Sequence, residues 1–122
     1  MSDKKQNILI VEDDTFLQGL MASKVNSNGF EITTASNGEE AMTALAKTKF
    51  DGILLDLMLP DISGFDILEN LKSDGSKIPV IVFSNLSDDK DIKKAMSLGA
   101  KEYLIKSNFT LEELIEKLKK VI

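Results

Sequence analysis

Three consecutive acidic residues are the first side chains in this chain that could do chemistry. Glu12, Asp13 and Asp14 follow directly on an apolar run at residues 8–11. Two carboxylates about 4 Å apart repel by roughly 4 kcal/mol at an effective dielectric constant near 20. Asp14 is explained as the N-cap of a helix that starts at Thr15, because an aspartate oxygen can accept the free N–H groups of a first turn. Glu12 and Asp13 stay unexplained, and a cation among the acids would offset their repulsion.

Three further reactive side chains stand near the ends of other apolar runs. Asp56 lies inside the run ILLDLML, where a carboxylate is hard to place in a core without a partner. Ser84 and Lys106 end two later runs. Taken singly, Glu12 and Asp13 could be solvated loop acids, Ser84 an ordinary strand-end serine and Lys106 an exposed lysine. Taken together, they supply carboxylates, a hydroxyl group and an ammonium group.

The composition excludes several other kinds of chemistry. The 122 residues contain no Cys and no His, which rules out disulfides, thiolate and imidazole metal ligands and Ser-His-Asp catalysis. With 20 Asp and Glu against 15 Lys and Arg, the net charge of −5 disfavours a nucleic-acid surface or an anionic membrane surface. No apolar run approaches the roughly 20 residues of a membrane span, and the polar start MSDKKQ is not a signal peptide. We expect a soluble, cytoplasmic protein without membrane insertion.

Apolar runs alternate with helix-like segments along the whole chain. We expect strands at residues 7–12, 30–35, 52–57, 79–84 and 102–106. Three of them are near-continuous aliphatic runs, typical of parallel strands covered on both faces, and the more polar run at 30–35 suits a sheet edge. Five strand–helix units predict an α/β fold with a doubly wound, five-stranded parallel sheet and five helices. We expect residues 1–122 to be a single domain, with no linker and no output domain.

Local patterns predict where the helices begin and end. Three segments have the form of a capping box, in which the first and fourth residues satisfy each other's backbone N–H groups. They are Ser36–Glu39, Ser63–Asp66 and Thr110–Glu113. Glycines at positions suited to helix C-termini are Gly29, Gly75 and Gly99. Three methionines, Met21, Met58 and Met96, are interpreted as packing residues.

The predicted fold brings the reactive side chains to one edge of the sheet. Ligands of open α/β sheets bind beyond the carboxyl ends of the strands, at the switch point in strand order. Mg²⁺ prefers oxygen ligands, and a carboxylate can itself be a nucleophile that forms an aspartyl-phosphate. We therefore predict a Mg²⁺ site at Asp13 and Asp56, with help from Glu12. Asp56 would accept the phosphoryl group, and Lys106 and Ser84 would contact its oxygens.

On these residues the chain resembles the receiver domains of two-component response regulators, a family that includes the single-domain chemotaxis regulator. The resemblance covers essentially the whole chain, from ILIVEDD through GILLDLMLPDISGFDIL and PVIVFS to LGAKEYLIK. It implies a flavodoxin-like sheet of strand order 2-1-3-4-5. It also implies phosphorelay signalling, with Mg²⁺-dependent acceptance of a phosphoryl group on Asp56 from a sensor histidine kinase or phosphotransfer protein. Such a domain is no turnover enzyme, although the family catalyses its own phosphorylation and dephosphorylation.

The family pattern implies further roles for matching positions. Asp13 would be a direct Mg²⁺ ligand, and the Met58 backbone carbonyl would complete the protein's share of ligands. Ser84 matches the switch hydroxyl and Tyr103 the switch aromatic residue. Phosphorylation would move both and reshape the surface of residues 88–122, which would bind a downstream protein rather than DNA. A homodimer on activation also fits the family.

Two positions depart from the family pattern. Lys106 is followed by Ser107 instead of the usual proline in a cis bond, and a cis bond before a non-proline residue costs roughly 2.5–4 kcal/mol, so the bond could be trans. Asn85 replaces a small residue, and we hypothesise that it narrows access to the phosphate and slows its loss. Both departures keep an alternative open, a degenerate receiver that no longer switches and acts as a constitutive docking module.

Other functions of similar folds fit the residues less well. A nucleotide or flavin binder would need a glycine-rich or hydroxyl-rich phosphate loop after the first strand, where this chain has EDDTF. A phosphatase with an aspartate nucleophile often has a second Asp two residues later, and that position is Met58.

Overall fold

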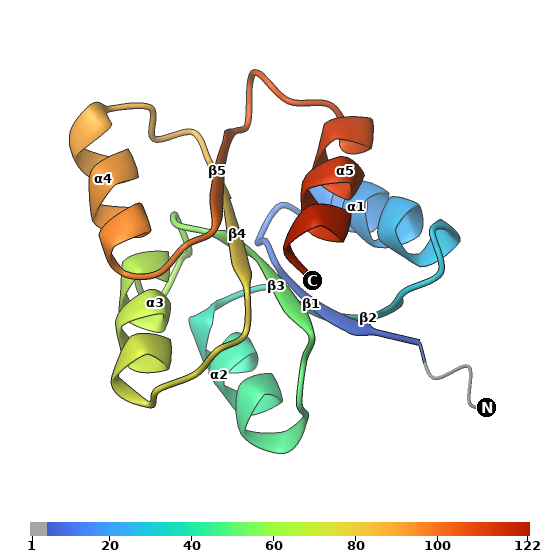
Figure 1. Cartoon of the computed structure of the whole chain (residues 1–122), viewed down its shortest axis with the longest axis horizontal. Helices are drawn as coiled ribbons and strands as arrows, with labels where there is room; N and C mark the ends of the chain where they lie inside the picture. Colours follow the sequence, from blue (N-terminus) through green and yellow to red (C-terminus); the bar gives the residue numbers. More distant parts are fainter. Residues whose placement is uncertain (1–4) are drawn as a thin grey trace.

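Five strands and five helices alternate along residues 5–122, the part of the chain that the computed structural model describes (Figure 1). The strands are β1 (Asn7–Val11), β2 (Glu31–Ala35), β3 (Gly52–Asp56), β4 (Val80–Ser84) and β5 (Glu102–Ile105). The helices are α1 (Thr15–Ser27), α2 (Gly38–Lys47), α3 (Gly64–Ser73), α4 (Asp89–Ser97) and α5 (Leu111–Val121). All neighbouring strands pair in parallel, in the order β2-β1-β3-β4-β5. The predicted fold is confirmed, and each strand is one residue shorter at one end than predicted.

Helices cover both faces of the sheet, α1 and α5 on one face and α2, α3 and α4 on the other (Figure 1). Successive residues of β1 therefore enter different cores, with Leu9 and Val11 in the cluster under α2–α4 and Ile8 and Ile10 in the cluster under α1 and α5. This explains the continuous aliphatic runs of β1, β3 and β4, because every residue of these central strands except Asn7 is buried on one face or the other. The helices run for 9 to 13 residues, and within residues 5–122 none is long and apolar enough to cross a membrane.

The helix ends follow the predicted caps with one exception. Capping boxes form at Ser63 and Thr110. The box predicted at Ser36 is wrong, because helix α2 is capped one residue later by Asn37, whose amide oxygen accepts the Glu40 N–H at 2.8 Å. A local pattern of capping residues could not distinguish two adjacent candidates. The three predicted glycines all adopt a positive φ just after a helix, a conformation that other residues avoid.

The prediction that the three methionines are packing residues holds only for Met21, which is fully buried. Met58 is 53% exposed in the loop after β3, and Met96 is 42% exposed on α4. Sequence spacing does not show which face of a helix or loop is left uncovered, so these two exposures had to come from the structure.

Candidate functional site

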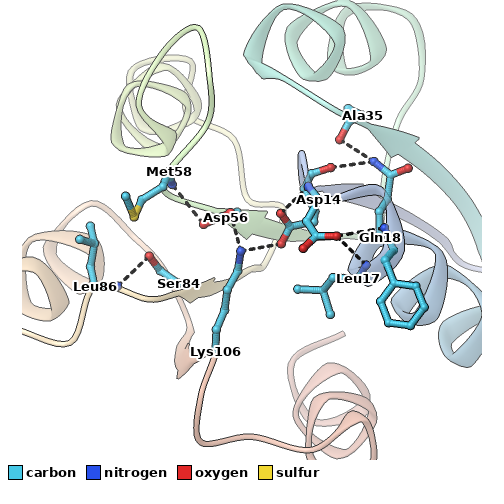
Figure 2. Close-up of polar contacts among 11 residues, drawn as sticks. Asp14, Leu17, Gln18, Ala35, Asp56, Met58, Ser84, Leu86 and Lys106 are labelled. Carbon is cyan, nitrogen blue, oxygen red and sulfur yellow. Dashed lines mark hydrogen bonds and ion pairs between the residues drawn. The ribbon is translucent and has the colours of Figure 1, made fainter.

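Side chains from four strand ends converge at the carboxyl edge of the sheet (Figure 2). Asp56 is the last residue of β3 and Ser84 the last of β4, while Glu12 and Lys106 directly follow β1 and β5. Asp56 is paired with Phe83 of β4, so Ser84 lies one position further toward the edge. The backbone N–H of Lys106 donates to the Ser84 carbonyl at 2.9 Å, which fixes the start of the Lys106 loop. The strand order therefore brings these side chains together as predicted.

Lys106 lies between two buried carboxylates. Its ammonium nitrogen is 2.7 Å from Glu12 Oε1 and 2.8 Å from Asp56 Oδ2 (Figure 2). Both carboxylate side chains are almost fully enclosed, at 0% and 2% exposure, and the lysine side chain is 16% exposed. Unpaired charges in such a place would be strongly unfavourable, so the ammonium group offsets part of the repulsion between the acids.

The pKa values of Glu12 and Lys106 reflect this arrangement. Burial raises the pKa of Glu12, because its charged form is desolvated, and this outweighs the lowering effect of Lys106 and of the Asp14 N–H. Burial alone would lower the pKa of Lys106, but its contacts with Asp56 and Glu12 hold that pKa above its usual value. Lys106 is therefore cationic, and a single ammonium group faces more than one carboxylate.

Carboxylate oxygens of Glu12, Asp13 and Asp56 lie within 4.8 Å of one another. Glu12 Oε1 is buried and accepts no well-aligned hydrogen bond within residues 5–122, so its 2.7 Å contact with Lys106 is an ionic contact of poor hydrogen-bond angle. Asp13 is exposed at the mouth of the cluster. The three carboxylates carry more negative charge than the single ammonium group of Lys106 can balance. Their oxygen atoms are the ligands that a hard divalent cation such as Mg²⁺ prefers.

The loop after Asp56 is held in a closed shape that keeps Met58 near the site. The Met58 N–H donates to Asp56 Oδ1 at 3.1 Å, Met58 and Ser63 form an isolated antiparallel bridge, and the Gly64 N–H donates to the Leu57 carbonyl at 2.8 Å. A Cβ at Gly64 would lie 2.5 Å from the Asp56 carbonyl oxygen, so only glycine allows this close approach.

Two residues predicted to switch are joined through a third that sequence reasoning missed. The Leu86 N–H donates to Ser84 Oγ at 3.1 Å, and the Tyr103 hydroxyl donates to the Leu86 carbonyl at 2.7 Å. Partial burial raises the pKa of the Tyr103 hydroxyl, which therefore stays protonated and able to donate this bond. Leu86 has no reactive side chain, so no sequence signal marks it.

Asp61 is a second residue whose contacts sequence reasoning missed. It lies in the loop after β3, and its carboxylate accepts the N–H groups of Gly38 at 2.8 Å and Glu39 at 2.9 Å, at the N-terminus of α2. These backbone hydrogen bonds hold the pKa of Asp61 below its usual value. Its partners are more than 20 residues away in sequence, so no local pattern could pair them.

The structure describes both departures from the family pattern, the Lys106–Ser107 bond and Asn85. No peptide bond within residues 5–122 is cis, so the Lys106–Ser107 bond is trans. Asn85 is exposed directly after the buried Ser84. Its proposed influence on phosphate loss stays a prediction.

Comparison with known proteins agrees with this geometry. Residues 8–119 match the family model described as the response regulator receiver domain. The DNA-binding response regulator MtrA of Mycobacterium bovis is 31% identical over 119 residues, which cover 98% of this chain and 51% of MtrA. The chain thus spans about half the length of the curated relatives that it matches.

Solved structures of response regulators have a similar fold. The receiver domain of Francisella response regulator 1452 superposes with a TM-score of 0.90 at 27% identity, over 96% of each chain. The response regulator protein TrrA of Thermotoga maritima, solved in complex with Mg²⁺ and BeF, has a TM-score of 0.85 at 30% identity, over 96% of this chain and 99% of TrrA.

Proposed function

This chain belongs to the response regulator receiver domain family of phosphorelay signalling, and on that premise we propose that Asp56 accepts its phosphoryl group. The observation that carries the proposal is the environment of the Asp56 carboxylate. It is enclosed at the carboxyl edge of the sheet, 2.8 Å from the Lys106 ammonium group and within the Glu12–Asp13–Asp56 cluster. The donor would be a phosphohistidine of a sensor kinase or phosphotransfer protein.

The proposed transfer is a displacement at phosphorus. A carboxylate oxygen of Asp56 attacks the phosphoryl group, a new P–O bond forms, and the P–N bond to the donor imidazole breaks with its electron pair left on nitrogen. Lys106 would contact a phosphoryl oxygen, and the contact of its ammonium group with Asp56 Oδ2 supports this role. The Ser84 hydroxyl can donate its own hydrogen to another phosphoryl oxygen. Loss of the phosphoryl group then follows by attack of water.

We assign the metal ligands to Asp13 and Asp56, with Glu12 acting directly or through water, and to the Met58 backbone carbonyl. When bound, Mg²⁺ neutralises the charge of the phosphoryl group and of the carboxylates. Support comes from the excess of carboxylate charge over positive charge in the cluster. It also comes from the buried Glu12 Oε1, which accepts no well-aligned hydrogen bond.

The switch proposal follows from the bonds on either side of Leu86. The Ser84 hydroxyl oxygen now accepts the Leu86 N–H. If Ser84 turns toward a phosphoryl group, that bond is lost, and the Leu86 carbonyl that holds the Tyr103 hydroxyl is free to shift. Movement of the Leu86 loop and Tyr103 would reshape the surface of residues 88–122, where a downstream protein or a second copy of this chain would bind.

The test is intact mass after incubation with acetyl phosphate. Wild type is compared with Asp56→Asn and with Asp74→Asn, an exposed aspartate outside the cluster, each with and without Mg²⁺. We expect one phosphoryl adduct on wild type and Asp74→Asn, only with Mg²⁺, and none on Asp56→Asn. An adduct that persists on Asp56→Asn would refute the assignment. A wild type that takes up no phosphoryl group from any donor would favour the constitutive docking module.

A further inference from the structure

Helix α1 holds the peptide that joins Glu12 to Asp13. The side-chain nitrogen Nε2 of Gln18 donates to the Glu12 carbonyl oxygen at 2.8 Å, and it lies 3.2 Å from both the Ala35 carbonyl and Ser36 Oγ. Figure 2 shows the Gln18 side chain reaching Ala35. The Ala35 carbonyl also accepts the Glu12 N–H at 3.0 Å. One amide group thus ties α1 to the ends of both β1 and β2.

The orientation of this amide group is determined by its neighbours. Two carbonyl oxygens face it, and a carbonyl can only accept a hydrogen bond. If the side-chain oxygen of Gln18 pointed toward them, both carbonyls would face another acceptor in place of an N–H donor. The nitrogen carries two hydrogens, so it can serve both carbonyls while the hydroxyl of Ser36 shares one of them.

No comparable hydrogen bond holds the side chain of Asp13. Within residues 5–122 its carboxylate takes part in no hydrogen bond or ion pair, and it is exposed in a bend between β1 and α1. Its direction therefore depends on its backbone. The Glu12 carbonyl and the Asp13 N–H belong to one rigid peptide plane, so a bond that fixes the carbonyl also fixes the plane from which Asp13 extends.

We propose that Gln18 is a positioning residue for the metal site. Its amide holds the Glu12–Asp13 peptide so that the Asp13 carboxylate is directed toward those of Glu12 and Asp56 before a cation arrives. This inference rests on the proposed Mg²⁺ site. Groups that orient metal ligands commonly change metal affinity by about 10-fold or more when removed, because the ligand must then be ordered during binding.

The test measures Mg²⁺ affinity directly, by isothermal titration calorimetry on the full chain. Gln18→Met keeps the length of the side chain and removes its donors, whereas Gln18→Asn keeps the amide but is too short to reach the carbonyls. We expect both to bind Mg²⁺ about 10-fold more weakly than wild type. Ser36→Ala removes only the hydroxyl contact and is expected to bind as wild type does.

Two further readouts separate positioning from general stabilisation. Phosphoryl labelling by acetyl phosphate should recover the wild-type rate in both Gln18 variants once Mg²⁺ is saturating, because the nucleophile and Lys106 are unchanged. A variant with a lower melting temperature but wild-type Mg²⁺ affinity would show a structural role only and would overturn the inference.

The result for wild type separates this inference from the proposal beneath it. If wild type binds no Mg²⁺, the proposed metal site is wrong and the role of Gln18 is overturned with it. If wild type binds Mg²⁺ and both Gln18 variants bind it equally well, the metal site stands and only the role of Gln18 is overturned.

Discussion

Lys106 makes the acidic cluster tolerable without making it neutral. Its ammonium group contacts Glu12 and Asp56, but Asp13 also belongs to the cluster and has no contact with the lysine within residues 5–122. The raised pKa of Glu12 shows the same imbalance, since burial and the Asp56 charge both oppose its ionisation. Changes of single charges should therefore have opposite effects with and without a divalent cation.

Removal of the Asp13 charge should stabilise the metal-free protein. Like charges about 4 Å apart in water repel by roughly 1 kcal/mol. Asp13→Asn removes one such repulsion and keeps the shape of the side chain. We expect a higher melting temperature without Mg²⁺ and a smaller gain when Mg²⁺ is added. Thermal unfolding of both proteins, with Asp74→Asn as a control outside the cluster, measures both effects. A lower melting temperature of Asp13→Asn without Mg²⁺ would contradict the repulsion argument.

Asn85 should prolong the phosphorylated state. Its side chain is exposed, and it lies between Ser84, which is proposed to contact the phosphoryl group, and Leu86. We expect about a threefold shorter lifetime for phosphorylated Asn85→Ala, equivalent to roughly 0.6 kcal/mol in activation free energy. Decay of the phosphorylated mass over time measures it, with Asn85→Gln as a control of similar bulk. An equal or longer lifetime for the alanine variant rules out this role.

At the scale of elements, the predictable features are those set by local sequence. Aliphatic runs placed the strands to within one residue, and Ser63 and Thr110 marked two helix starts. The missed features join distant segments. Asp61 caps a helix that begins more than 20 residues earlier, and Leu86 links Ser84 to Tyr103 through backbone groups alone. Such contacts depend on how loops meet after folding, and a single sequence gives no pattern for them.

The stability of the N-terminus of helix α2 should depend on pH through Asp61, which lies in the loop after β3. The folded-state pKa of Asp61 lies below its usual value because its carboxylate accepts the Gly38 and Glu39 N–H groups. The resulting stabilisation is complete above about pH 3.9, the usual pKa of aspartate, and is lost as the pH falls through the folded-state pKa. Asp61→Asn should therefore melt at a lower temperature than wild type at neutral pH.

The difference in melting temperature between wild type and Asp61→Asn should narrow below about pH 4. Melting curves from neutral to acidic pH measure this convergence. Asp74→Asn serves as the matched control, because Asp74 is exposed and accepts no N–H group from another helix within residues 5–122. A difference that stays constant across the whole pH range would show that the Asp61 charge does not contribute to the cap.

At the scale of the whole molecule, the two helical layers give the domain two distinct faces. Phe16 is 76% exposed on α1, on the same face as α5, whereas Met96 is 42% exposed on α4 of the opposite face (Figure 1). Phe16 is also two residues after Asp14, at the edge where the reactive side chains meet. We therefore expect a protein donor that reaches Asp56 to contact this apolar side chain.

Phe16→Ala should therefore slow phosphoryl transfer from a protein donor without changing the chemistry at Asp56. Burial of a phenylalanine side chain contributes about 1.5–3 kcal/mol, so its loss should reduce the apparent affinity for the donor by roughly 10-fold or more. The donor is a histidine kinase or phosphotransfer protein that is first shown to label wild type. Labelling by acetyl phosphate should be unchanged, because the small molecule needs only the site itself. Met96→Ala, on the opposite face, should match wild type with both donors, and equal slowing by the two variants would exclude a specific donor contact at Phe16.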